Sequence, residues 1–94
     1  MKVRFYLDPE TGQPHVHNHG VSEEEVRRVL AARGEDRAAG SNTRFKMGQS
    51  TSGRFLRVVY APDREPGSVF VITAYELRVK ELKAHRRYMR RRSR

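Results

Sequence analysis

Cationic side chains lie on several of the segments that we predict to be strands in this 94-residue chain. A guanidinium group can bind two phosphate oxygens at once. Such cations stabilise the charge that develops at a phosphate group in a transition state, while a neighbouring base and acid move protons to and from the reacting oxygens. Three cations could share one open sheet face if the strand register allows it: Arg44, Lys46 and Arg57.

Groups that transfer protons follow these cations along the chain. We predict catalytic roles for Arg57, Tyr75, Glu81 and His85, with Tyr88 as a further acid or base. Imidazole is suited to this task because it accepts and donates protons near neutral pH. The same residues have a plainer interpretation, in which the strand cations are solvated surface positions and Tyr75 anchors a helix.

Alternating histidines form the segment His15-Val16-His17-Asn18-His19. They would share a face of an extended chain, and imidazole is the commonest metal ligand. No acidic residue lies at tight ligand spacing, so we favour a polar loop whose histidines cap neighbours, contact phosphate or enter the site. We therefore predict no metal ion and no other cofactor.

The net charge of +9 is carried almost entirely by the end of the chain. Residues 78–94 contain nine Lys or Arg and one acid, Glu81, which leaves a net charge of only +1 for residues 1–77. Such asymmetry predicts a polyanionic partner, with RNA, DNA, the ribosome and an acidic protein all compatible. The predicted nucleic-acid contacts are Arg44, Lys46, Arg54, Lys80, Lys83, Arg87, Arg90 and Arg91.

Composition excludes several other classes of protein. The chain has no cysteine, so it can form neither a disulfide nor a thiolate metal site, which fits a reducing cytoplasm. No apolar run approaches the roughly 20 residues of a membrane helix, and the N-terminus does not read as a signal peptide. We find no glycine-rich phosphate loop, Ser/His/Asp or Cys/His arrangement, or pair of catalytic carboxylates. An ordinary hydrolase or nucleotide enzyme is therefore disfavoured.

The elements that must position these groups centre on residues 68–74. Apolar and β-branched residues on both faces of this segment predict a strand covered on both sides. Residues 3–7, 43–47 and 54–60 are further predicted strands, while residues 35–41 read as a polar connection in which 37–39 could begin an edge strand.

Two helices complete the predicted domain. The first has a capping box from Ser22 to Glu25, a hydrophobic staple from Val21 to Val26, and Gly34 as its C′ residue. The second is expected to start near Ala74 or Tyr75 and to form the basic C-terminal helix or tail, residues 75–94. Residues 1–94 are thus predicted to form one α+β domain of order β-α-β-β-β-α. Its three- or four-stranded antiparallel sheet would carry both helices on one face.

An ordered series of short motifs resembles a known family. The motifs are Asp8-Pro9, His19-Gly20-Val21-Ser22, Gly48, Gly53-Arg54-x-Leu56-x-Val58-Val59-Tyr60, and Val71-Ile72-Thr73-Ala74 followed by Glu81 and a basic helix with a tyrosine. This series is similar to the BrnT-type toxins and related small domains of the RelE/ParE-like toxin–antitoxin superfamily. The resemblance implies a RelE-like fold and a ribonuclease that cleaves mRNA without a metal. It also implies inhibition by a small DNA-binding antitoxin of the ribbon-helix-helix type.

Two other functions remain open at this point. A non-catalytic module that binds RNA or the ribosome would use the same basic helix. A ParE-like inhibitor would instead direct this surface against a protein target.

Overall fold

The computed structural model describes residues 1–92, so Ser93 and Arg94, the end of the predicted basic segment, lie outside the described residues. The elements in chain order are β1 (Lys2–Phe5), the 3-10 helix η1 (His15–His19), α1 (Glu23–Ala31), β2 (Glu35–Ala38), β3 (Arg44–Gln49), β4 (Phe55–Pro62), β5 (Ser68–Glu76) and α2 (Val79–Arg92). Neither described helix has the length and apolar character of a membrane-spanning segment.

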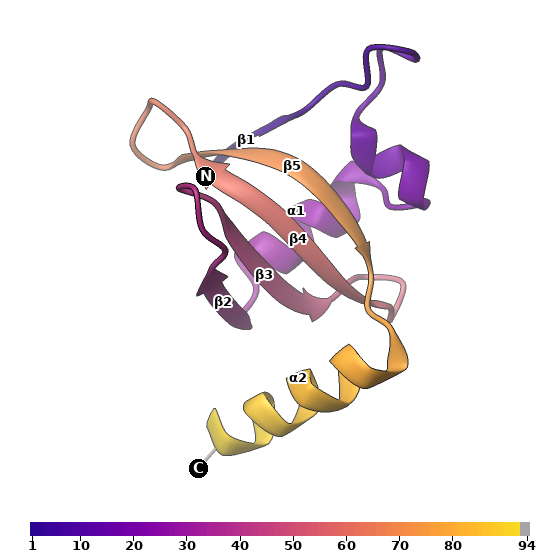
Figure 1. Ribbon diagram of the computed structural model, residues 1–94, viewed down its shortest axis with the longest axis vertical. Helices are drawn as coiled ribbons and strands as arrows, with labels where there is room; N and C mark the ends of the chain where they lie inside the picture. The colour runs from indigo at the N-terminus through magenta and orange to yellow at the C-terminus, as the bar shows by residue number, and fades with distance from the viewer. Residues whose placement is uncertain (93–94) are drawn as a thin grey trace.

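The five strands form one sheet in the order β1-β5-β4-β3-β2 (Figure 1). The α+β class is confirmed, but the prediction of three or four antiparallel strands is wrong in two respects. β1 pairs with β5 in parallel. A parallel pair needs a long crossover connection, and here the rest of the domain lies between the two strands in sequence. Residues 35–38 form the edge strand β2, antiparallel to β3, within the segment 35–41 that we expected to be a polar connection in which 37–39 could begin an edge strand. Hydrogen bonding to β3 therefore overrides the polar composition of this segment.

Helix α1 forms from its local sequence as predicted. Ser22 and Glu25 make both hydrogen bonds of the capping box, and Val26, Val29 and Leu30 are buried in the core. The expected glycine cap is wrong, since the helix ends at Ala31 with Ala32 in an extended conformation. Gly34 is instead required by a close approach, because a Cβ there would lie 2.3 Å from the Met47 carbonyl oxygen.

The prediction that the last helix starts near Ala74 or Tyr75 is also wrong. Tyr75 and Glu76 continue β5 and pair with Arg57 and Leu56 of β4. The ladder therefore extends by one more residue pair on each face before the chain can turn. α2 begins at Val79, and the backbone N–H of Arg78 donates to the Glu81 carboxylate at 3.2 Å.

The two helices cover opposite faces of the sheet, so the prediction that both lie on one face is wrong. Consecutive strand residues point to opposite faces. Leu56 and Val58 belong to the core cluster that includes α1, whereas Arg57 contacts α2. Figure 1 accordingly shows α1 behind the sheet, with α2 at one end of the molecule beyond β2 and β3. α2 contacts the sheet through Glu81, His85 and Arg86, while Val79 in its first turn is 72% exposed.

Candidate functional site

Three of the four predicted catalytic residues meet where β4 and β5 face the first turn of α2. The guanidinium of Arg57 donates a hydrogen bond from Nη1 to the Tyr75 hydroxyl at 3.1 Å. The same nitrogen lies 2.8 Å from Oε2 of Glu81. We call Arg57, Tyr75 and Glu81 the Arg57 cluster. Strand pairing positions the first two, and the early turn of α2 adds the third.

The sheet holds the Arg57 side chain in a fixed orientation while leaving part of its hydrogen-bonding capacity unused. Its guanidinium lies 4.9 Å from the centre of the Phe45 ring and 5.8 Å from that of Tyr75. Nε is buried and has no hydrogen-bond partner among the described residues, and the same is true of the Thr73 hydroxyl on this sheet face. An unpaired buried donor is costly. Nε itself is closed to a ligand, and the Arg57 side chain as a whole is 22% exposed, so a phosphate would have to bind the guanidinium through its terminal nitrogens.

An open pocket of about 620 Å³ adjoins the Arg57 cluster. Its lining residues are His19, Tyr75, Glu76, Arg78, Lys80 and Glu81. The His19 ring lies edge-on to Tyr75, with 6.1 Å between the ring centres. η1 presents this histidine because Gly20, at φ +70°, ends the short helix in a left-handed conformation. The pocket thus combines a cation-bound phenol and carboxylate with an imidazole and two further cations.

His19 was only one of three loop histidines in the sequence prediction. His19 is the loop histidine that lines the pocket because residues 15–19 form the short helix η1. An extended chain would instead have placed the alternating histidines on one face. His15 contacts His19 with ring centres 5.4 Å apart and lies near Asp8. No group of three potential ligands capable of holding a metal occurs within residues 1–92. Glu76 and Arg78 are pocket residues that were not singled out from the sequence.

The structure does not bring His85 into the Arg57 cluster. Its side chain is only 2% exposed, with Nδ1 3.3 Å from Oε1 of the equally buried Glu35 on β2. The Phe55 ring packs edge-on to the imidazole at 6.0 Å. His85 therefore joins α2 to the sheet, and its predicted catalytic role has no support from its position.

The expected face shared by Arg44, Lys46 and Arg57 does not exist. Lys46 pairs with Val58 and points to the α1 side, where Nζ donates to the carbonyls of Leu30 and Ala32. A cation at this place stabilises the C-terminal end of α1. Arg44 lies on the same side as Lys46 and binds Asp36 at 3.0 Å, which raises the pKa of its guanidinium. Both predicted nucleic-acid contacts thus have intramolecular partners.

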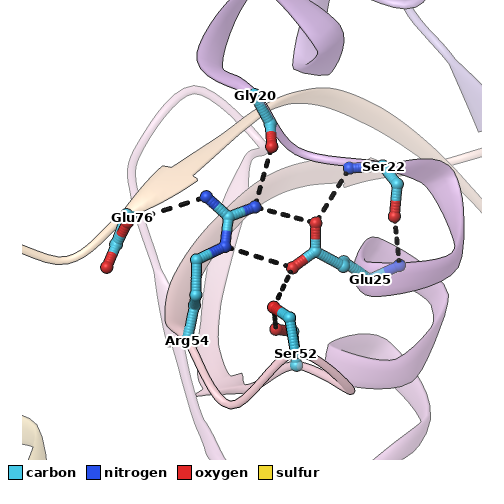
Figure 2. A network of polar contacts seen from close by, with 7 residues as sticks. Gly20, Ser22, Glu25, Ser52, Arg54 and Glu76 are labelled. Carbon is cyan, nitrogen blue, oxygen red and sulfur yellow. Dashed lines mark hydrogen bonds and ion pairs between the residues drawn. The ribbon is translucent and has the colours of Figure 1, made fainter.

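Arg54 is likewise engaged inside the molecule (Figure 2). It holds the Glu25 carboxylate through Nη2 at 2.8 Å and Nε at 3.3 Å, and Nη2 also donates to the Gly20 carbonyl. Ser52 Oγ donates to the same carboxylate at 2.7 Å. Arg54 therefore fastens the start of α1 to β4, with Glu76 of β5 at 3.6 Å. The remaining predicted contacts, Lys80, Lys83, Arg87, Arg90 and Arg91, are exposed along α2.

The Glu25 network predicts a specific loss of stability in acid. The Arg54 hydrogen bonds lower the pKa of Glu25 from 4.5 to about 2, with help from Ser52 and the Ser22 backbone. A carboxylate with a lowered folded-state pKa stabilises the fold above its unfolded pKa and loses that contribution as pH falls toward about 2. We expect the urea-derived free energy of unfolding to fall by roughly 2 kcal/mol from this group, after allowing for solvent screening.

The check on this prediction is a comparison of wild type with Glu25→Gln at pH 6, 4 and 2.5. The substituted protein should be less stable at pH 6 and show a shallower decline with acid. Parallel declines in the two proteins would assign the acid sensitivity to other carboxylates. Glu23→Gln, at an exposed position in the same helical turn, is the matched control.

Comparison with protein-family models, with curated proteins and with solved structures finds no match to this chain. The resemblance to BrnT-type toxins therefore stays a prediction, and the functional argument depends on the geometry of the site.

Proposed function

We propose that this protein is a metal-independent endoribonuclease acting on mRNA, as the toxin of a type II toxin–antitoxin system. The observation that carries the proposal is the Arg57 cluster, where a guanidinium with an unpaired buried donor lies beside a pocket lined by acid and base groups. Such a site supplies the three functions that RNA cleavage requires.

In the proposed reaction, Arg57 and the Tyr75 hydroxyl hold the non-bridging oxygens of the scissile phosphate. Glu81 accepts the 2′-OH proton, and the 2′-oxygen attacks phosphorus. His19, in its protonated form, donates a proton to the departing 5′-oxygen. The products are a 2′,3′-cyclic phosphate and a 5′-hydroxyl, so atoms and charge balance without a cofactor. Arg78 and Lys80 line the pocket where flanking phosphates would lie.

The ion pair between Arg57 and Glu81 fits this division of roles. In the free protein the two side chains neutralise each other at 2.8 Å. A phosphate entering the pocket competes with Glu81 for the guanidinium, as two anions sharing one cation must. Binding of substrate would thereby release the carboxylate for the 2′-OH.

Inhibition by a small antitoxin belongs to the same proposal. An acidic segment of a ribbon-helix-helix antitoxin would complement the cations exposed along α2, which carry much of the net charge of +9. The lack of cysteine in this chain fits a cytoplasmic site of action for the toxin.

The test is an incubation of purified protein with single-stranded RNA in EDTA, with mRNA on ribosomes as a second substrate. We expect cleavage that leaves cyclic phosphate and 5′-hydroxyl ends, and no cleavage of a substrate with 2′-deoxyribose at the scissile position. Binding without cleavage of either substrate would leave the non-catalytic RNA-binding module, which the exposed α2 cations also favour. Cleavage only after addition of zinc or manganese would contradict the proposed chemistry and direct attention to His15, His17 and His19.

A further inference from the structure

A second hollow, of about 530 Å³, lies farther along α2. It opens between the C-terminal end of α1, the β3–β4 connection and the second half of α2. Its lining includes Arg28, Arg33, Phe55, His85, Arg86 and Arg90, and we call this hollow the arginine groove. Arg28 lies on α1, Arg33 follows the end of that helix, and the other two arginines lie on α2, so only the folded chain assembles the groove.

The charge of the arginine groove is of one sign. Four arginines line it, and none of the described lining residues is acidic. All four arginine side chains are exposed. Like charges gathered around one hollow repel each other, and a bound polyanion would relieve that repulsion. The groove therefore complements an anionic ligand.

Phe55 gives the groove an aromatic surface among these cations. The Arg86 guanidinium lies over the Phe55 ring at 5.6 Å, and His85 meets the ring edge-on at 6.0 Å. Because the buried imidazole holds the ring, a flat group could replace Arg86 on its face. Arg86 would then be available for a phosphate. An aromatic face ringed by arginines is suited to a nucleobase with its phosphates, whereas an acidic peptide would use the charges alone.

The position of Phe55 connects the groove with the Arg57 cluster. Phe55 and Arg57 are alternate residues of β4, on the same face and about 7 Å apart. α2 runs past both, contacting the first through Arg86 and the second through Glu81. One extended strand of nucleic acid can therefore follow α2 from the first pocket into the second.

We propose that the arginine groove binds single-stranded nucleic acid, with one base stacked on Phe55 and adjacent phosphates held by Arg28, Arg33, Arg86 and Arg90. This inference rests on the proposed function, for which the groove supplies a substrate subsite beside the Arg57 cluster. It assigns a role to Arg28 and Arg33, which lie outside the basic C-terminal segment.

The experiment uses a short all-2′-deoxy oligonucleotide, such as a hexamer of thymidylate, which lacks the 2′-OH needed for cleavage. Its affinity for the full chain is measured by fluorescence anisotropy at several salt concentrations. Arg28→Ala/Arg33→Ala should weaken binding about tenfold at low salt, and should lower the salt slope by about 1.4 for two lost single-strand phosphate contacts. The control Arg27→Ala/Arg64→Ala removes the same charge outside the groove, where Arg27 stacks on Phe5.

A second measurement reports on stacking. The chain has no tryptophan, so Phe55→Trp introduces a single indole at the proposed stacking position. We expect the oligonucleotide to quench its fluorescence, and Phe55→Leu to lower affinity at least about fivefold. Circular dichroism of each variant establishes that it is folded.

Equal losses in the groove and control variants, or an indole that poly-glutamate quenches as well as the oligonucleotide does, would overturn the proposal. The second result would indicate an acidic protein as the occupant. Because the deoxy probe cannot be cleaved, these outcomes are independent of nuclease activity. Failure of the RNA cleavage assay with groove-dependent binding intact would contradict the proposed function alone.

Discussion

Arg57→Ala is expected to lower the rate of RNA cleavage by at least about 100-fold, the usual effect of removing a donor that stabilises transition-state charge. The reason is that the guanidinium contacts both Tyr75 and Glu81 and is the cation nearest to both, so its loss removes the charge that would stabilise the phosphorane. The loss should appear mainly in kcat under saturating substrate. Single-turnover cleavage in EDTA measures it directly.

Two variants make this prediction specific. Arg57→Lys keeps the charge but loses the planar fork, so it should retain only part of the activity. Arg27→Ala, an exposed arginine on the opposite side of the sheet from α2, should cleave at the wild-type rate. An Arg57→Ala protein that is folded and fully active would remove Arg57 from the mechanism.

Arg54→Ala is expected to destabilise the fold by about 2–3 kcal/mol, because it leaves the Glu25 carboxylate buried without its cation. Glu25 is only 7% exposed, and Arg54 provides two of its hydrogen bonds (Figure 2). Removing the guanidinium also deprives the Gly20 carbonyl of a donor. Urea unfolding monitored by circular dichroism gives the difference.

The double variant Glu25→Gln/Arg54→Met provides the matched comparison. It removes both charges together, so it should be more stable than Arg54→Ala alone. Arg64→Ala, at an exposed turn position, should leave stability within about 0.5 kcal/mol of wild type. A double variant as unstable as Arg54→Ala would show that packing of the arginine side chain, rather than an unpaired charge, accounts for the effect.

Local features of the chain could be predicted from sequence because their contacts span only a few residues. The Ser22–Glu25 capping box is the clearest case, since both of its hydrogen bonds join residues three apart. The alternating apolar residues of β3 and β4 likewise specify strands in whichever sheet they join. The α+β class follows from these local patterns.

The long-range partners of charged side chains could not be predicted from residue type. Lys46 and Arg54 are cations on predicted strands, so solvent or nucleic acid was the expected partner of each. One instead caps α1, and the other holds Glu25, 29 residues away. A cation can be stabilised by water, phosphate, carbonyl or carboxylate oxygens. The choice among them depends on which oxygens the folded chain brings near.

The candidate site shows the same difference between what residue types predict and what the folded chain decides. The sequence by itself determined which residues can bind phosphate or move protons. Three of the predicted four meet because β4 pairs with β5 and the first turn of α2 adds Glu81. The tertiary structure decided that His85 is excluded and His19 included. Glu81 and His85 occupy one face of α2, yet a single turn of about 5.4 Å carries the helix from Arg57 on β4 to Glu35 on β2. Docking of α2 across the strands thus separates two residues that helical periodicity alone would keep together.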